Sequence, residues 1–216
     1  MRILLLGANG MTGTEVVRRA LDAGHDVTAF VRDPTRMKVV DPARVRVAVG
    51  EVTRDRAAVA AAATGCDAVI SALGSGRSLR SLRSPTVMAD AVPVIVAAMA
   101  EAGVSRLVFL SSLGVGESWA RTPLLLKALY KPALSAVFAD KAAGERALRA
   151  SALDWTLVHP PMLSNGPHTG RFTAGADLRL SGAPRISRAD LADFMVRQAE
   201  SGAYSRTTVV LAAGQR

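Results

Sequence analysis

The sequence contains few cysteines, aromatic residues and lysines, and it lacks a long apolar run. Cys66 is the only cysteine among 216 residues, which excludes an intrachain disulfide and a cysteine-based zinc site. The longest apolar run, from Ala91 to Ala100, contains Pro93 and is far shorter than the ~20 residues that a membrane-spanning helix needs. The residues after Met1 have the pattern of a strand and not of a signal peptide. We therefore expect a cytoplasmic protein with no membrane partner.

Aromatic residues make up only 4% of the chain, and most of its 27 basic residues are arginines, against 18 acidic residues. The net charge of +9 is compatible with a nucleic acid, an anionic lipid or a phosphate-bearing ligand as partner. The arginines are scattered along the chain, however, and the few aromatic residues offer little surface for stacking bases. The composition therefore disfavours nucleic-acid binding, which we keep as a rival hypothesis.

Short runs rich in Val, Ile and Leu alternate with longer helical patterns, which is typical of βαβ units and a parallel sheet. Strands are expected at residues 2–7, 26–32, 44–50, 67–73, 106–112, 154–159 and 207–213. Helices are expected at about residues 13–23, 55–63, 85–102 and 139–150. With 50% hydrophobic residues the chain can also bury a sizeable core. The fold class is thus α/β, a Rossmann-type doubly wound parallel sheet in one domain over residues 1–216.

Caps and prolines set several boundaries of these elements. Ser84 followed by Pro85 is a favourable helix start, and Gly103 is a favourable stop. Pro93 is expected to kink or shorten the helix that contains it. Two more prolines within residues 117–138 predict a broken helical connection there.

After residue 160 the pattern changes. A loop rich in Gly, Ser, Thr and Asn follows, to about residue 176. Ser187 and Asp190 then form a capping-box pattern, with Asp in place of the usual Glu, and start a last helix that ends near residue 201. We expect residues 160–216 to form a small cap on the substrate side, with this loop, the last helix and the last strand.

A glycine-rich turn joins the first expected strand to the first helix. It reads Gly7-Ala8-Asn9-Gly10-Met11-Thr12-Gly13, with the spacing G-x-x-G-x-x-G. Glycine lets backbone N–H groups at a helix start approach a pyrophosphate closely, and the last glycine permits close packing of helix on strand. Turns from strand to helix use glycine in other proteins too, but the position at the start of a βαβ series favours dinucleotide binding.

The end of the second expected strand bears on the choice between the two nicotinamide cofactors. A carboxylate here binds the ribose 2′-hydroxyl of NAD, whereas arginine suits the 2′-phosphate of NADP. Arg32 and Arg36 favour NADP(H) over NAD(H), while Asp33 could pair with either arginine or serve NAD. A solvated basic loop is the alternative without a ligand.

The ordered motifs of the chain resemble those of atypical short-chain dehydrogenase/reductases. They are G-A-N-G-M-T-G at residue 7, V-R-D at 31, G-E-V at 50, S-P-T-V-M at 84, F-L-S-S at 109, K-x-x-x-E-x-x-L at 141 and W-T-L-V-H-P-P at 155. P-P-M at residue 160, T-G-R-F at 169 and I-S-R-A-D-L at 186 are similar to the NADPH-dependent biliverdin reductase B/flavin reductase group and its NmrA-like relatives. The likeness covers nearly the whole chain.

This resemblance implies an NADP site along the carboxyl ends of the strands. The residues that it places on the adenosine half are Gly7, Asn9, Gly10, Met11, Thr12, Gly13, Arg32, Arg36, Glu51 and Val52. Those that it places along the ribose and pyrophosphate are Ala72, Leu73 and Gly74. Those that it places around the nicotinamide are Ser111, Ser112, Pro160, Pro161 and Met162.

The sequence departs from the Tyr-x-x-x-Lys pair of better-known members. Counted back from Lys141, the tyrosine position holds Val137, and Tyr130 lies too far upstream. Without a phenol beside the lysine there is no evident general acid, which argues against sugar epimerase or ordinary ketone reductase activity. Hydride transfer to a flavin or another conjugated acceptor fits better, because the acceptor delocalises the incoming charge and solvent can supply the proton.

Ser112 is the candidate catalytic residue, as a hydrogen-bonding orienter beside the nicotinamide more than as a proton donor. A Ser-Ser pair that simply ends a strand is the alternative. Lys141 is a candidate for binding the cofactor ribose or carboxamide region, and an ordinary solvated lysine is equally compatible.

Other polar residues give weaker signals. Arginines at 77, 80 and 83 could receive an anionic substrate or lie on a solvated loop. The three histidines form no metal-ligand pattern: His25 is expected in an exposed turn, His159 buried as a structural residue, and His168 on the surface.

Three functions remain open from the sequence. The first is an NADPH-dependent reductase of a flavin-like, quinone-like or other conjugated acceptor, as a small-molecule partner. The second is a non-catalytic, NmrA-like redox sensor that binds NADP(H), and the third is a nucleic-acid-binding protein. The oligomeric state is undefined, and a monomer is compatible with the sequence.

Overall fold

A mostly parallel, eight-stranded sheet organises the part of the chain that this computed structural model describes, residues 1–37, 41–74, 86–120 and 122–214. Its order is β3–β2–β1–β4–β5–β6–β10–β8. The strands are β1 (Arg2–Leu6), β2 (Asp26–Val31), β3 (Val45–Val49), β4 (Ala68–Ser71), β5 (Arg106–Leu110), β6 (Asp154–His159), β8 (Phe172–Gly175) and β10 (Thr207–Ala213). Among these described strands, only β8 pairs antiparallel, with β10. The expected Rossmann-type fold is confirmed.

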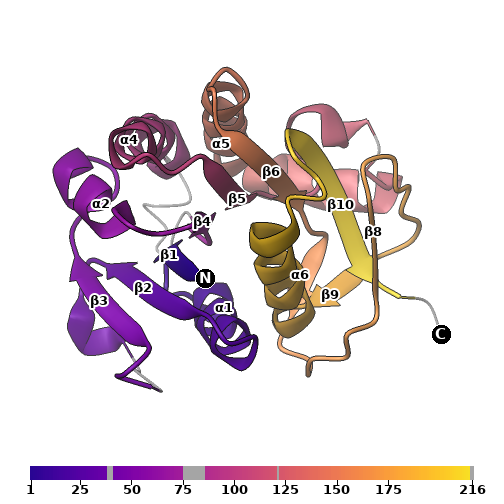
Figure 1. The fold of residues 1–216 in the computed structure, drawn as a ribbon. Helices are drawn as coiled ribbons and strands as arrows, with labels where there is room; N and C mark the ends of the chain where they lie inside the picture. The colour runs from indigo at the N-terminus through magenta and orange to yellow at the C-terminus, as the bar shows by residue number, and fades with distance from the viewer. Residues whose placement is uncertain (38–40, 75–85, 121, 215–216) are drawn as a thin grey trace.

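Helices cover both faces of this sheet (Figure 1). They are α1 (Met11–Asp22) and α6 (Arg188–Ser201) on one face, and α2 (Arg56–Ala63), α4 (Val87–Ala102) and α5 (Leu124–Arg149) on the other. The strand period of two explains the two cores, because Ile3 and Leu5 pack toward α1 and α6, whereas Leu4 and Leu6 pack toward α2 and α4. Near-continuous apolar strands are therefore buried on both sides, as the sequence indicates.

The longest helix corrects an expectation. Residues 117–138 were expected to be a broken connection, but after the 3₁₀ turn η2 (Gly116–Trp119) one helix, α5, runs from Leu124 to Arg149 and includes Pro132. Pro93 likewise lies inside α4 without ending it. A proline removes one backbone hydrogen bond, and tertiary packing outweighs this loss, since α4 and α5 pack along each other. The expected start at Ser84 and Pro85 lies outside the described residues, and Gly103 ends α4 in a left-handed conformation as expected.

The C-terminal part holds more strands than expected. The segment after residue 160, expected to be a loop, contains β7 (Met162–Ser164) and β8, and β9 (Arg185–Ser187) pairs with β7 in a small parallel sheet. These strands are three or four residues long, too short for a periodic pattern to be visible in the sequence.

Two buried polar side chains join the main sheet to α6. Arg106 donates to the carbonyl oxygen of Gln198 at 2.6 Å and to Thr156 Oγ1 at 2.8 Å. His25, expected in an exposed turn, is only 7% exposed, and its Nε2 lies 2.6 Å from Glu200 Oε1. The exposed-turn expectation was wrong because Glu200 is distant in sequence and becomes a neighbour only when α6 packs beside α1.

Asp190 ties the start of α6 to the 164–172 loop. The Ser187 side chain caps α6 by accepting from the Asp190 N–H at 2.9 Å, as expected. The carboxylate of Asp190 accepts from the backbone N–H groups of Thr169 and Gly170, at 2.7 and 2.9 Å, instead of closing a full capping box. Burial alone would raise the pKa of Asp190, but hydrogen bonds from Thr169, Gly170 and Ser187 hold it below the usual value.

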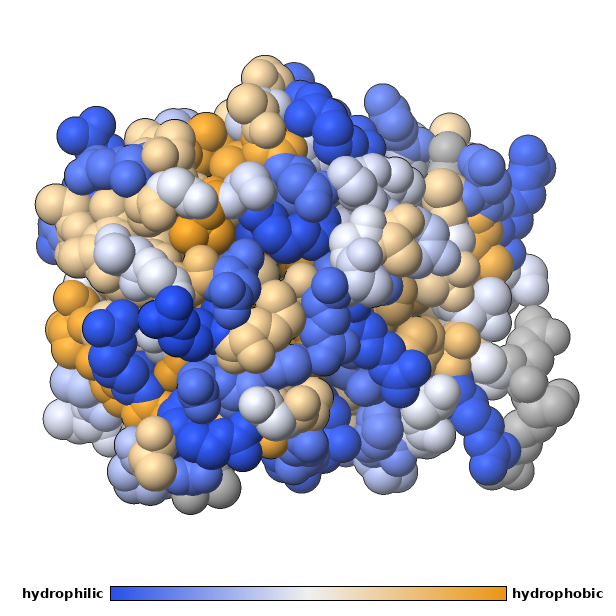
Figure 2. Space-filling model, in the orientation of Figure 1, coloured by the Kyte–Doolittle hydropathy of each residue, from blue (hydrophilic) through white to orange (hydrophobic). Residues whose placement is uncertain are grey.

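The outer face seen in Figure 2 is mixed, with hydrophilic residues spread over it and interrupted by apolar ones. Among the described residues, no helix combines the length and the apolar character needed to cross a bilayer.

Replacing Asp190 by Asn should lower the free energy of unfolding by about 1–3 kcal/mol, because at least one backbone N–H of the loop loses a charged acceptor. Since the folded-state pKa of Asp190 is depressed, the stabilisation is present above about pH 4 and is lost as the pH falls through that pKa. Denaturant unfolding at neutral and acidic pH measures both effects. The matched control is Asp22→Asn, which removes an exposed ion pair with Arg19 and should change stability by less than about 0.5 kcal/mol. Equal losses in the two variants would contradict the role given to Asp190.

Candidate dinucleotide site

The predicted site residues gather where the strand order reverses. β1 is followed in sequence by β2 on one side and is paired with β4 on the other, so the carboxyl ends of β1 and β4 lie at a topological switch point. Open α/β sheets bind ligands in the crevice outside such carboxyl ends. The glycine turn follows β1, Ala72 to Gly74 follow β4, Ser111 and Ser112 follow β5, and Pro160 and Pro161 follow β6.

The glycines of the turn are required by its geometry. Gly7 has φ +87°, in the left-handed region, and a Cβ there would lie 2.8 Å from the carbonyl oxygen of Ala72. A Cβ on Gly13 would lie 2.2 Å from the carbonyl oxygen of Gly7. A side chain at position 13 would therefore push α1 away from the turn, which confirms the expected close packing of helix on strand. Gly10 is less constrained, because its Cβ would lie 3.2 Å from the same oxygen.

The start of α1 fits an anionic group. Gly10 is the N-cap and offers no side-chain cap, and the first turn of the helix carries no acidic residue. The first N–H groups of a helix need acceptors, and the helix dipole favours a negative charge there. Asn9 donates through Nδ2 to the carbonyl oxygen of Asp33 at 2.8 Å, while its buried Oδ1 has no hydrogen-bond partner among the described residues. Both features suit a pyrophosphate and adenosine placed over this turn.

The loop after β2 leaves its arginines available. Arg32 is 74% exposed, and its Nη1 lies 3.7 Å from Glu51 Oε2, while Arg36 is exposed at the end of the 3₁₀ turn η1 (Pro34–Arg36). The Asp33 carboxylate accepts from the Thr35 N–H at 3.0 Å and from the Thr35 hydroxyl at 2.6 Å, and these bonds lower its pKa. The Asp33 carboxylate is therefore engaged in capping the turn, although Asp33 is exposed like the two arginines.

Helix α5 supplies one partner to each of the two adjacent serines after β5. Lys141 donates from Nζ to Ser112 Oγ at 2.8 Å. The Ser111 hydroxyl donates to Glu145 Oε1. Lys141 and Glu145 are four residues apart and therefore lie on the same face of the helix. The structure thus brings Ser111, Ser112 and Lys141 together, and it adds Glu145, to which the sequence assigned no role.

A buried network continues behind Ser111. His159, fully buried at the end of β6, has its Nε2 2.9 Å from Glu145 Oε1 and its Nδ1 2.9 Å from Ser118 Oγ. Burial alone would raise the pKa of Glu145, but the contact with His159 and the hydrogen bond from Ser111 outweigh it and lower that pKa. The buried, structural assignment of His159 is confirmed. Only the K-x-x-x-E spacing hinted at this network, because Ser118 and His159 are far from Glu145 in sequence.

The remaining predicted residues are arranged around the same edge. Val52 and Ala72 are buried, whereas Leu73 is half-buried and Gly74 exposed. Pro160 accepts from the Leu113 N–H at 2.9 Å through its carbonyl oxygen, which keeps the chain after β6 beside the chain after β5. The arginines at 77, 80 and 83 lie outside the described residues. His168 is on the surface, as expected, with its Nε2 3.4 Å from Asp193 Oδ2.

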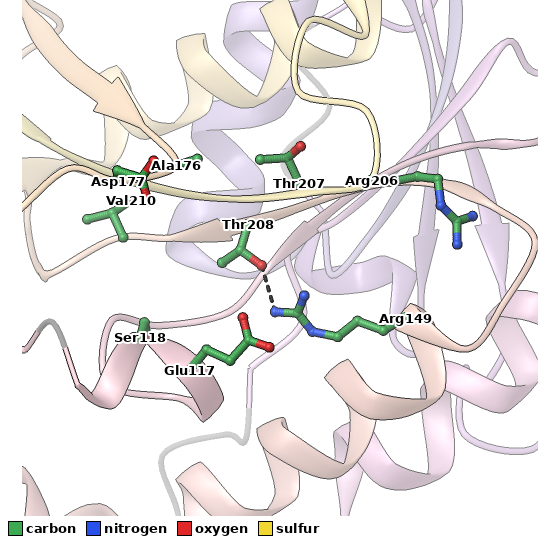
Figure 3. Close-up of a pocket in the computed structure, with 9 residues that line it drawn as sticks. All are labelled: Glu117, Ser118, Arg149, Ala176, Asp177, Arg206, Thr207, Thr208 and Val210. Atoms are coloured by element: carbon green, nitrogen blue, oxygen red, sulfur yellow. Dashed lines mark hydrogen bonds between the residues drawn. The ribbon is translucent and has the colours of Figure 1, made fainter.

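A separate cavity of about 210 Å³ lies against β10 and contains none of the predicted site residues (Figure 3). Its lining residues are Glu117, Ser118, Arg149, Ala176, Asp177, Arg206, Thr207, Thr208 and Val210. Arg149 reaches across it and donates to Thr208 Oγ1 at 2.6 Å. Both of its arginines are held by protein partners, Arg149 by Thr208 and Arg206 by the carbonyl oxygen of Leu153 at 3.1 Å.

The doubly wound sheet, the glycine turn and the uncapped start of α1 define a dinucleotide-binding protein of Rossmann type. The chain belongs to the NAD(P)H-binding family, whose match covers residues 7–201. This agrees with the resemblance to short-chain dehydrogenase/reductases noted from the motifs.

Similar proteins cover nearly the whole chain. An uncharacterized sugar epimerase of Bacillus subtilis strain 168, YhfK, is 30% identical over 199 residues, which are 91% of this chain and 86% of that protein. ChuY of Escherichia coli O157:H7, an anaerobillin reductase, is 25% identical with a TM-score of 0.80 over 100% of this chain and 98% of that one. A wide-type short-chain dehydrogenase/reductase from Veillonella parvula DSM 2008, solved in complex with NADP, has a TM-score of 0.79 over 99% and 94% of the two chains. At 19% identity this last likeness concerns the fold alone.

Replacing Gly13 by Ala should destabilise the protein by about 1–3 kcal/mol, because the new Cβ overlaps the Gly7 carbonyl oxygen and α1 must shift. Gly10→Ala is the matched control in the same turn and should cost clearly less, since a few tenths of an ångström of movement relieves its contact. Thermal or denaturant unfolding of the two variants measures the difference. A Gly13→Ala protein as stable as the parent would show that α1 is not packed against the turn as described.

Proposed function

We propose that this protein is an NADPH-dependent reductase that transfers hydride to a conjugated small-molecule acceptor, flavin-like or quinone-like in chemistry. The observation that carries the proposal is the pair formed by Lys141 and Ser112 at the carboxyl end of β5, with buried Val137 at the position where a catalytic tyrosine would stand. The site has the positioning groups of a nicotinamide enzyme, and its described side chains include no phenol.

Each part of the site has a role in holding the cofactor and the acceptor. The N–H groups at the start of α1 bind the pyrophosphate, and Arg32 and Arg36 bind the 2′-phosphate that distinguishes NADPH from NADH. Ser112 orients the reacting groups beside the nicotinamide, and Pro160 to Met162 flank it. When bound, NADPH supplies the hydride and is released as NADP⁺.

The absence of the tyrosine favours reduction of a conjugated acceptor over epimerisation. Epimerases and ketone reductases of this fold need a group that moves a proton on and off a hydroxyl, and Val137 cannot do so. A conjugated acceptor spreads the incoming negative charge, so positioning accounts for most of the rate. The name of ChuY is consistent with this choice, whereas the name of YhfK points to sugar chemistry, for which this chain lacks the usual acid.

The direct test measures NADPH oxidation by the purified protein with FMN, riboflavin and quinones, followed by the loss of nicotinamide absorbance. We expect turnover with at least one of these acceptors and little with simple sugars or ketones. Tight NADPH binding without oxidation by any acceptor would overturn the reductase proposal and would favour the redox-sensing alternative. If the protein instead binds DNA with an affinity that falls as the salt concentration rises, and does not bind NADPH, the nucleic-acid hypothesis is supported.

Arg32→Ala should weaken NADPH binding roughly 10- to 100-fold and leave NADH binding nearly unchanged, because it removes a charge-assisted bond to the 2′-phosphate. Isothermal titration with both cofactors measures the two affinities. The control is Arg56→Ala, which removes an exposed arginine on α2 that pairs with Glu101 and should affect neither cofactor. Equal losses for NADPH and NADH in Arg32→Ala would show that Arg32 does not read the phosphate.

A further inference from the structure

We propose that Lys141 is the proton donor of the reaction and that Ser112 relays its proton to the acceptor, in place of the missing tyrosine. The inference rests on the proposed reductase function and deepens it, because it assigns the proton as well as the hydride. It changes the expected role of Ser112 from an orienter to a relay. It also changes the expected role of Lys141 from cofactor binding to catalysis.

The hydrogen bond between the two side chains has the direction that a relay requires. An ammonium group can only donate, so Ser112 Oγ accepts from Lys141 Nζ at 2.8 Å. Among the described residues this is the one hydrogen bond recorded for Ser112 Oγ, so the hydroxyl hydrogen is available to a ligand. Ser112 is half-buried at the carboxyl end of β5, whereas Lys141 is buried behind it. The hydroxyl therefore stands between the lysine and the space outside the sheet.

The serine next to it is held on a different partner. Ser111 donates to Glu145 and is buried, so it is occupied within the protein. Because the two serines are consecutive, the Ser111–Glu145 bond also fixes the backbone from which Ser112 extends. Lys141 and Glu145 thus act from one helix face on two neighbouring side chains, one for proton transfer and one for position.

Burial and two nearby carboxylates together give Lys141 a pKa a little above neutral pH, so its amine is protonated at pH 7. Burial lowers the pKa of Lys141 to about 8, although the nearby carboxylates of Glu145 and Asp140 raise it. Glu145 is itself in contact with His159 from β6 and Arg149 from α5. Asp140 accepts from the N–H groups of Met88 and Ala89 at the start of α4, whose first turn also carries Asp90. A donor with a pKa close to the working pH is the most effective general acid.

The step balances in atoms and electrons. The acceptor gains the cofactor's hydride at one atom, and the electron pair of the conjugated bond moves to the far atom. That atom takes the proton from the Ser112 hydroxyl while Lys141 Nζ returns a proton to the same oxygen. The cofactor leaves oxidised, and the neutral Lys141 amine regains its proton from solvent.

The first test measures the titration of Lys141 without any turnover. The chain contains only four lysines, at positions 38, 127, 131 and 141, so their side-chain NMR signals can be assigned by single Lys→Arg variants. We expect Lys141 to titrate near pH 8. Ser112→Ala should shift the Lys141 titration, because it removes the group that accepts from Nζ. Titration of Lys141 together with the other lysines, unaffected by Ser112→Ala, would overturn the proposal.

The second test measures the pH dependence of kcat for NADPH oxidation. A general acid must be protonated, so the wild-type rate should be high below about pH 8 and fall above it. Lys141→Arg keeps the positive charge but cannot release a proton, and it should lower kcat about 100-fold and abolish the fall near pH 8. Ser112→Ala keeps the lysine and removes the relay, and it should lower kcat in the same way. Lys127→Arg, at the side chain that lies over the Trp119 ring, is the matched control and should keep the wild-type profile.

The outcomes separate this inference from the function on which it rests. If the wild type turns over, and Lys141→Arg and Ser112→Ala have the same rate and pH profile, the relay is overturned. The reductase function then stands, and the proton comes from solvent. No wild-type turnover with any acceptor would overturn the reductase function and the relay with it. Titration of Lys141 near pH 8 would support the reductase function and the relay if Lys141→Arg and Ser112→Ala are also slow. Their rates should then show no fall near pH 8.

Discussion

The spacing of Lys141 and Glu145 on α5 is the constraint on which the candidate site depends. One turn of helix presents an ammonium group to Ser112 and a carboxylate to Ser111. Lys141 and Glu145 both follow Pro132 in α5, so their contacts with the serines depend on the part of the helix after the proline.

The rest of the fold brings the candidate cofactor residues to the same edge of the sheet. Parallel strands place all their carboxyl ends together, so the glycine turn after β1 and the serines after β5 share one side of the molecule. The turn is kept tight because Gly13 has no side chain to separate α1 from Gly7. Arg106 of β5 and His25, just before β2, bond to Gln198 and Glu200 and so hold α6 against the sheet.

Much of the architecture could be predicted from the sequence, because buried strands and a glycine turn are local signals. The bounds of β6 and β10 agree with the expectation, as does the cap of α6. Tertiary effects account for the failures: Pro132 was overridden by the packing of α4 on α5, and His25 found Glu200, which is remote in sequence. The Ser112 candidate was visible from its motif, whereas its bond to Lys141 needed three dimensions. The role of Glu145 was hidden for the same reason.

The central claim is that hydride passes directly from NADPH to an acceptor held at the carboxyl end of β5. It is tested most directly with NADPH carrying deuterium at either face of nicotinamide carbon C4, in the presence of the acceptor that supports turnover. The account predicts slower turnover with one of the two labelled cofactors, because a defined face of the nicotinamide is held against the acceptor. Two results would contradict it. One is binding of both labelled cofactors without reduction of any acceptor. The other is an equal rate with both labelled cofactors and with unlabelled NADPH, under conditions where hydride transfer limits the rate.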